Sequence, residues 1–280
     1  MIDKKLLKKR FSQRAETYDN YAIVQKKMAQ KLMNKLSSFT YGDRLNILEI
    51  GCGTGYLTNL IYTNFPHAKI TAVDLAPGMI DIAKKRLNGK AVTFLCADIE
   101  DIEMLEGYDI IISNATFQWL NNLPLMLTKL RKALNKGGVI SFSTFGNLTF
   151  SELHSSYDSA KQVLNLQMET APGQSFFTML ELSNLSKGAF NNSHEIPIEN
   201  FRVEEDLEIE YFQTVHEFFT AIKKIGANNS NAGKSCQRPS FFKEVIKQYD
   251  NNYRDEHGVR ATYQCLFVTY KKFEGNLEIG

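Results

Sequence analysis

The sequence of 280 residues predicts an α/β protein with a mostly parallel sheet and helices on both faces. Short apolar runs alternate with helical patterns over about 100 residues, which is typical of parallel sheets. A glycine-rich turn follows the first apolar run, and acidic or amide residues stand at the ends of several runs. These features together predict a ligand site at the carboxyl edge of the sheet.

The first half of the chain contains this alternation. Apolar residues at Val24, Met28, Leu32 and Leu36 recur every four positions and predict an amphipathic helix over 23–36. Short apolar runs bounded by turn residues predict buried strands at 46–50, 69–73, 92–95, 108–113 and 138–144. Helical patterns separate these runs at 54–65, at 78–87 and along the stripe Leu123, Leu127, Leu130 and Leu134.

After Gly146 the alternation stops, and we divide the chain into four segments. Residues 1–40 are expected to form N-terminal helices that are part of a lid, and 41–146 the core. Residues 147–200 are interpreted as a lid insertion, helical or irregular, over the mouth of the sheet. Residues 201–280 complete the sheet and add substrate-side helices, with strands at 202–212 and 262–270, helices at 216–225 and 240–253, and a loop at 227–233.

Composition excludes several classes of protein. The chain has 33 Lys and Arg against 31 Asp and Glu, so nothing in its charge indicates nucleic acid or a membrane surface as a partner. No apolar run approaches the roughly 20 residues of a membrane helix, and the basic N-terminus lacks the apolar stretch of a secretory signal. The four cysteines form no CxxC pair, so we expect no metal site and a cytoplasmic location.

The glycine-rich turn is the sequence Glu49-Ile-Gly51-Cys-Gly53-Thr-Gly55. Alternate glycines allow a tight turn and a close approach of the backbone to a ligand, and the following helix presents free N–H groups. Dinucleotide enzymes use the spacing G-x-G-x-x-G, whereas here it is G-x-G-x-G with an acid two residues earlier. A carboxylate at Glu49 suits a ligand with an ammonium group, such as the methionine end of S-adenosylmethionine.

This motif resembles the first motif of the class I S-adenosylmethionine-dependent methyltransferases, and the resemblance continues to about Gly146. It implies the Rossmann-like class I fold with S-adenosylmethionine as cofactor. By this resemblance Asp74 accepts hydrogen bonds from the ribose hydroxyls, Asp98 binds the adenine amino group, and Asn114 lies beside the methionine part. The complete set of expected cofactor contacts is Glu49, Gly51, Gly53, Gly55, Asp74, Leu75, Met79, Asp98, Ile99, Asn114 and Trp119.

The residues after the fourth strand indicate the class of acceptor. Methylases of exocyclic amines carry Asn or Asp followed by Pro-Pro and an aromatic residue, whereas this chain has Asn114-Ala-Thr-Phe117-Gln118-Trp119. This difference argues against amine methylation. Methyl transfer is an in-line displacement, so the protein mainly aligns the reacting groups.

Segments outside the core are similar to the malonyl-[acyl-carrier protein] O-methyltransferases of biotin synthesis. They are Arg10-Phe-Ser-Gln-Arg14-Ala-Glu-Thr-Tyr18-Asp-Asn-Tyr21-Ala, the stretch 114–119, the stretch 142–153 and Lys224-Ile-Gly226-Ala-Asn-Asn229. The resemblance covers nearly the whole chain and is weakest over about 155–200. It implies methylation of the free carboxylate of a malonyl group, with malonyl-acyl-carrier protein or malonyl-CoA as partner.

A malonyl carboxylate is ionised at neutral pH, so it needs no general base, but it does need a cation or hydrogen-bond donors to hold it. The candidates are Arg10, Arg14, Lys223 and Lys224, with the hydroxyls of Tyr18 and Tyr21. Each of them is also a common type of solvated surface group. The resemblance further implies that Tyr18 is a catalytic residue, which lies in the lid over the bound cofactor.

The basic cluster Lys4, Lys5, Lys8, Lys9 and Arg10 can be read in two ways, as a docking patch for an acidic carrier protein or as a solvated helix face. Two other functions also stay open. One is methylation of a small metabolite at carbon or hydroxyl. The other is a nucleotide-binding oxidoreductase, against which the glycine spacing counts.

Overall fold

The computed structural model describes residues 2–39, 41–42, 44–103, 106–166, 173–191, 200–225 and 239–273. The loop expected at 227–233 and parts of the insertion expected at 147–200 lie outside these residues. Among the described helices, none combines the length and the apolarity that a bilayer-spanning segment needs.

Within the described residues, eight strands form one sheet, and seven of them follow the order β3-β2-β1-β4-β5-β8-β6. Strands β1 to β5 pair in parallel, while β8 runs antiparallel to β5, β6 and the short β7. The predicted mostly parallel sheet is therefore confirmed. The strands are β1 (Asn46–Ile50), β2 (Lys69–Asp74), β3 (Val92–Cys96), β4 (Tyr108–Asn114), β5 (Leu134–Phe145), β6 (Phe201–Phe212), β7 (Arg254–Asp255) and β8 (Gly258–Lys271).

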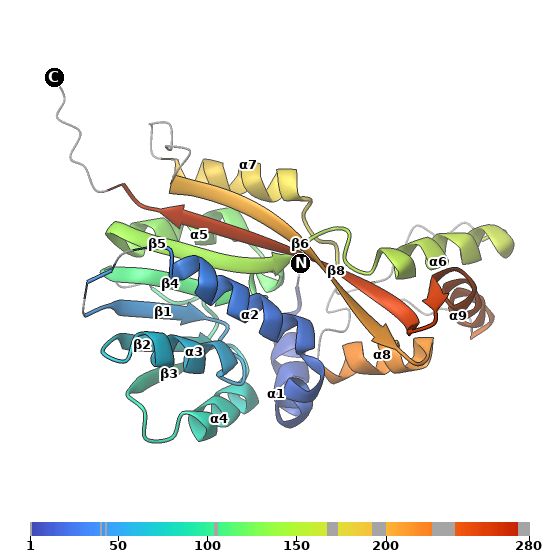
Figure 1. Cartoon of the computed structure of the whole chain (residues 1–280), viewed down its shortest axis with the longest axis horizontal. Coiled ribbons are helices and arrows are strands. Elements are labelled where there is room, and N and C mark those ends of the chain that lie inside the picture. Colours follow the sequence, from blue (N-terminus) through green and yellow to red (C-terminus); the bar gives the residue numbers. More distant parts are fainter. Residues whose placement is uncertain are drawn as a thin grey trace.

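Helices cover both faces of this sheet (Figure 1). Helices α2 (Ile23–Leu36) and α3 (Tyr56–Asn64) contribute to the core on one face, and α5 (Leu123–Ala133) and α7 (Met179–Phe190) to the core on the other. Helix α1 (Lys4–Tyr21) packs against α4 (Pro77–Arg86) and also contacts α8 (Val215–Lys224). In Figure 1, α8 lies with α6 (Ser151–Val163) and α9 (Pro239–Tyr253) beyond one end of the parallel strands.

Strand β5 begins four residues before the predicted strand at 138–144. Leu134 completes the expected helical stripe, yet it is the first residue of β5 and pairs with Tyr108. The register then shifts before Ile110 pairs with Val139, and Gly137 has a positive φ of 74°. A glycine inside a strand reads as a boundary in sequence, whereas here it accommodates an irregularity within a continuing strand.

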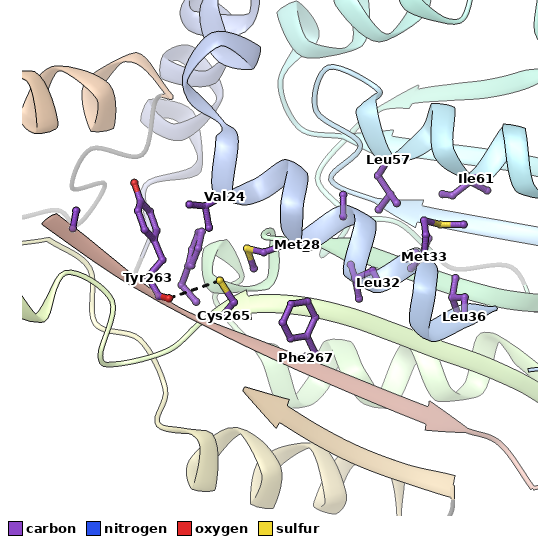
Figure 2. Close-up of a cluster of buried hydrophobic side chains, with 14 of the residues drawn as sticks. Val24, Met28, Leu32, Met33, Leu36, Leu57, Ile61, Tyr263, Cys265 and Phe267 are labelled. Carbon is purple, nitrogen blue, oxygen red and sulfur yellow. Dashed lines mark hydrogen bonds between the residues drawn. The ribbon is translucent and has the colours of Figure 1, made fainter. Parts of the chain in front are cut away.

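The larger core cluster is centred on α2, whose apolar face points at the sheet (Figure 2). Met28 and Leu32 are fully buried and lie near Cys265 and Phe267 of β8 and Leu57 of α3. The spacing of four that predicts this helix is therefore the spacing of its buried contacts.

We predict that Leu32→Ala lowers the free energy of unfolding by about 2–5 kcal/mol, since a fully buried leucine leaves a cavity when truncated. The matched control is Leu180→Ala on α7, where the leucine is 70% exposed, with an expected change within about 0.5 kcal/mol. Urea unfolding of the three proteins measures both values. Equal losses in the two variants would contradict the assignment of α2 to the core.

Candidate active site

The site lies where the strand order reverses. The chain passes from β1 outward to β2 and β3 and then returns to β4, so β1 has β2 on one side and β4 on the other. Loops leaving the carboxyl ends of such neighbouring strands diverge and open a crevice. The glycine turn follows β1, Asp74 ends β2 and Asn114 ends β4, which brings the predicted cofactor residues to this crevice.

The glycine turn uses its glycines for different reasons. Gly51, Gly53 and Gly55 all have positive φ, at 71°, 52° and 79°. A Cβ on Gly51 would overlap the side chain of Thr116, and one on Gly55 would lie 2.8 Å from the side chain of Leu87. A Cβ on Gly53 would meet nothing within 4 Å, because Gly53 borders open space. Gly51 and Gly55 therefore permit close packing, and Gly53 leaves the wall of the crevice flat.

Asp74 ties the glycine turn to the end of β2. Its Oδ2 accepts a hydrogen bond from the backbone N–H of Gly53 at 2.8 Å, and its Oδ1 accepts one from Ala76 at 2.8 Å. Burial raises the pKa of Asp74 to about 6, although these two backbone hydrogen bonds oppose the rise. A carboxylate oxygen can accept more than one hydrogen bond, so each oxygen can still take a ligand hydroxyl.

Glu49 is a buried acid without a hydrogen-bond partner. It is 1% exposed, and neither carboxylate oxygen has a partner among the described residues. Burial raises its pKa to about 8, the nearby Thr58 hydroxyl lowers it somewhat, and the charge of Asp74 raises it further. The small cavity that Glu49 borders is also lined by Tyr18, Gln25 and Asn114. An unpaired buried carboxylate of this kind is suited to a cationic ligand group.

Helix α1 forms part of the wall of the crevice, and its first residue is Lys4. Lys4 forms ion pairs with Asp98 at 3.2 Å and with Glu100 at 2.6 Å. Glu100 in turn accepts hydrogen bonds from the backbone N–H groups of Asn121 and Asn122. Lys4, alone among the lysines of the N-terminal basic cluster, therefore lines the crevice.

The carboxyl end of α1 is anchored on the glycine turn, and this anchor places Tyr18. Asp19 accepts a hydrogen bond from the Thr54 hydroxyl at 2.8 Å and forms an ion pair with Arg86. Tyr18, one residue earlier, borders the crevice and the Glu49 cavity. Burial raises the pKa of the Tyr18 hydroxyl, so this group is a protonated donor at neutral pH.

A second, larger cavity of about 390 Å³ adjoins the crevice. It has mainly aromatic and aliphatic walls, which include Phe145, Phe176 and Phe219. The two spaces share four lining residues, Phe11, Tyr18, Ala115 and Trp119, and the Phe11 and Trp119 rings meet edge to face at 5.8 Å. Such an apolar volume, reached from a polar crevice, suits an acyl chain next to a cofactor.

The structure brings most of the predicted residues together. The crevice is lined by Tyr18, Gly51, Gly53, Asp74, Leu75, Met79, Asp98, Ile99, Asn114 and Trp119. Glu49 lines the adjoining small cavity, and Lys223 lines the large one. The other predicted residues lie outside these linings: Gly55 packs against α4, Arg14 is exposed, Tyr21 packs on the main core, and Arg10 and Lys224 are half-buried.

Several lining residues were not predicted as site residues, among them Phe11, Gln25 and Thr116. Gln25 had a sequence signal, because it precedes Ala29, Met33 and Leu36 on the apolar side of the predicted helix. A polar residue among buried positions indicates either a cap or a site. Phe11 and Thr116 carried no comparable signal, since an aromatic or a threonine beside a motif is common in packing.

We predict that the stability of the ligand-free protein depends on the proton of Glu49. Its folded-state pKa of about 8 lies above its ordinary value of 4.5, so the folded state holds a proton that the unfolded chain releases. The protonated Glu49 therefore stabilises the folded state fully below pH 4.5, and this stabilisation is lost as the pH rises toward about 8. Glu49→Gln should therefore be more stable than wild type at pH 8, by about 1–2 kcal/mol, and similar at pH 5.

Urea unfolding at both pH values measures this difference, with Glu16→Gln on the exposed side of α1 as the control. A Glu49→Gln effect of the same size at pH 5 and pH 8 would mean that the carboxyl group does not titrate in this interval.

Comparison with known proteins agrees with this geometry. Residues 47–138 match a family described as a methyltransferase domain. Among solved structures, the YcgJ protein from Bacillus subtilis superposes with a TM-score of 0.57 at 11% identity, covering 88% of this chain and 99% of that one. The plantazolicin methyltransferase BpumL, solved in complex with SAH, gives 0.51 at 16% identity, covering 96% and 95%. These structures share the fold, which confirms the predicted class I methyltransferase architecture.

Relatives of higher identity match along nearly the whole chain. The malonyl-[acyl-carrier protein] O-methyltransferase of Priestia megaterium is 53% identical over 272 residues, which are 97% of this chain and 99% of the relative. The enzyme of the same name from Acetivibrio thermocellus is 46% identical, covering 97% and 95%. These identities show that the chain belongs to the malonyl-[acyl-carrier protein] O-methyltransferase family.

Proposed function

We propose that this protein transfers a methyl group from S-adenosylmethionine to the free carboxylate of a malonyl group carried by acyl-carrier protein. The observation that carries the proposal is the junction at Tyr18, where the crevice that holds Asp74, Asp98 and Asn114 meets a large apolar cavity. The relatives are named for this reaction. Masking the charge as an ester would let fatty-acid enzymes extend the chain toward the pimeloyl unit of biotin.

The described residues fit S-adenosylmethionine. The unpaired carboxylate of Glu49 suits the ammonium group, and the space beside Gly53 admits the ligand without a Cβ in the way. Asp74 would accept from the ribose hydroxyls and Asp98 from the adenine amino group, with Met79 and Trp119 among the apolar walls. When bound, the cofactor supplies an electrophilic methyl group on a sulfonium.

The large cavity fits an anionic nucleophile that needs no base. None of its described lining residues is Asp or Glu, so no carboxyl group of the lining repels an anionic substrate. Burial lowers the pKa of His154, which therefore stays neutral at physiological pH. A malonyl carboxylate is already ionised, so the residues of the cavity have to orient it and exclude water.

The malonyl group and the part of the acyl-carrier protein that bears it would enter the large cavity beside α8 and α9. Lys223 and Phe242 are exposed yet also line the cavity, so they mark its opening, and Phe242 packs against Phe219 at 5.1 Å. Lys243, on the same helix as Phe242, is exposed. These lysines favour an acidic carrier at this face, whereas Lys4 of the N-terminal cluster already pairs with Asp98 and Glu100.

The proposal is tested by offering malonyl, acetyl and succinyl thioesters in parallel and analysing the products by mass spectrometry. We expect a base-labile methyl ester on the malonyl substrate and no product from acetyl, which has no carboxylate oxygen. Methylation of acetyl would refute the proposal. Consumption of a free small metabolite in place of all three thioesters would favour the alternative of a metabolite methyltransferase.

We further predict that Asp74→Ala weakens S-adenosylmethionine binding by about 2–4 kcal/mol, because it removes a charged acceptor of two ribose hydrogen bonds. Calorimetry gives the dissociation constant. The control is Asp81→Ala, which removes an exposed carboxyl from the neighbouring helix α4 and should leave the constant unchanged. Unchanged binding in Asp74→Ala would remove Asp74 from the cofactor site.

A further inference from the structure

We propose that the side-chain amide of Gln25 holds the acceptor carboxylate in place for methylation. This inference rests on the proposed function and assigns one residue of this chain to the substrate. It concerns the first turn of α2, next to the junction of the cavities.

Gln25 stands between two of the cavities. Gln25 lines both the large apolar cavity and the small cavity that Glu49 borders. Tyr18 is the other residue that these two cavities share, and Tyr18 also borders the crevice. A carboxylate that reaches from the apolar cavity toward the Glu49 cavity therefore passes Tyr18 and Gln25, the two residues that line both.

Gln25 is largely buried, yet its side-chain amide has no hydrogen-bond partner among the described residues. Gln25 is only 7% exposed, and it is the one polar side chain among the buried residues of α2. Its backbone carbonyl accepts a hydrogen bond from Asn114 Nδ2 at 2.9 Å, which fixes the start of the helix. No described residue hydrogen-bonds to its side-chain amide, and the amide atoms are not among the polar atoms that are sealed from solvent. Because Gln25 lines both cavities, its amide is available to a ligand group there.

The surroundings favour a substrate carboxylate as this partner. Asn114 already has a partner at both polar atoms of its amide, since its Oδ1 accepts from the Ser143 hydroxyl at 2.7 Å and its Nδ2 donates to the Gln25 carbonyl. The Tyr18 hydroxyl offers a second donor at the same junction. Two neutral donors from Gln25 and Tyr18 can hold one carboxylate oxygen and leave the other oxygen free to attack.

A neutral hydrogen-bond donor also suits methyl transfer to a carboxylate better than a cationic side chain does. A lysine or arginine at this point would stabilise the ionised ground state and so raise the barrier to its use as a nucleophile. The product is a neutral ester, which an amide releases easily. The position of Lys223 at the opening of the cavity, away from the junction, agrees with this division of roles.

The test compares Gln25→Leu with wild type, using a malonyl thioester of N-acetylcysteamine as the acyl substrate. Leucine keeps the volume but cannot donate, so we expect kcat/KM to fall about 10- to 100-fold while the dissociation constant for S-adenosylmethionine stays within about twofold. The control on the same helix is Asn34→Leu, at an exposed position outside the three linings that should leave kcat/KM unchanged. Thermal unfolding confirms that each variant folds.

A second variant, Gln25→Glu, has nearly the same shape and gives a readout that a packing role would not produce. An ionised carboxyl repels the substrate, whereas a protonated one can donate to it, so the activity of this variant relative to wild type should rise as the pH falls.

Three outcomes would overturn the inference. Activity of Gln25→Leu within twofold of wild type would show that the amide does not hold the substrate. Loss of cofactor affinity with an unchanged KM for the malonyl thioester would assign Gln25 to the cofactor instead. Failure of the wild-type protein to methylate any malonyl thioester would remove the proposed function itself, and this result is distinct from the other two.

Discussion

The hydrogen bond from the Gly53 N–H to the Asp74 carboxylate is the contact on which the rest of the site depends. It joins the ends of two neighbouring parallel strands and holds the glycine turn against the sheet. The backbone N–H groups of Gly51 and Cys52 add to it by donating to the carbonyl of Val73. The same turn offers Thr54 as the anchor for Asp19 of α1, so the position of Tyr18 follows from it.

This arrangement places two carboxyl groups with raised pKa values close together. Burial raises the pKa of Asp74 to about 6 and that of Glu49 to about 8, and the charge of Asp74 contributes to the second. In the ligand-free site Glu49 therefore keeps its proton at neutral pH, and a cationic ligand group would favour its ionised form. Functional sites commonly retain such unfavourable groups because the ligand supplies the missing partners.

The sequence predicts the sheet, the glycine turn and the acids at strand ends because these depend on local pattern. Ile47 and Leu48 are buried on opposite faces, so their strand is a continuous apolar run that periodicity detects. Gln25 and Phe11 belong to helices far from the motif in sequence, and only tertiary packing brings them to the crevice. The cationic candidates Arg10 and Arg14 lie outside the cavity linings for the same reason, since helix orientation is set by packing rather than by charge.

Helix α1 forms part of the wall of both ligand spaces, through Phe11 and Tyr18. A displacement of this one helix therefore exposes both compartments together. Access to the cofactor space and access to the acyl space would then change together. The anchor between Asp19, Thr54 and Arg86 lies at the carboxyl end of α1, and the ion pairs of Lys4 lie at its amino end. A raised ionic strength would weaken these ion pairs at both ends of α1 and so favour such a displacement.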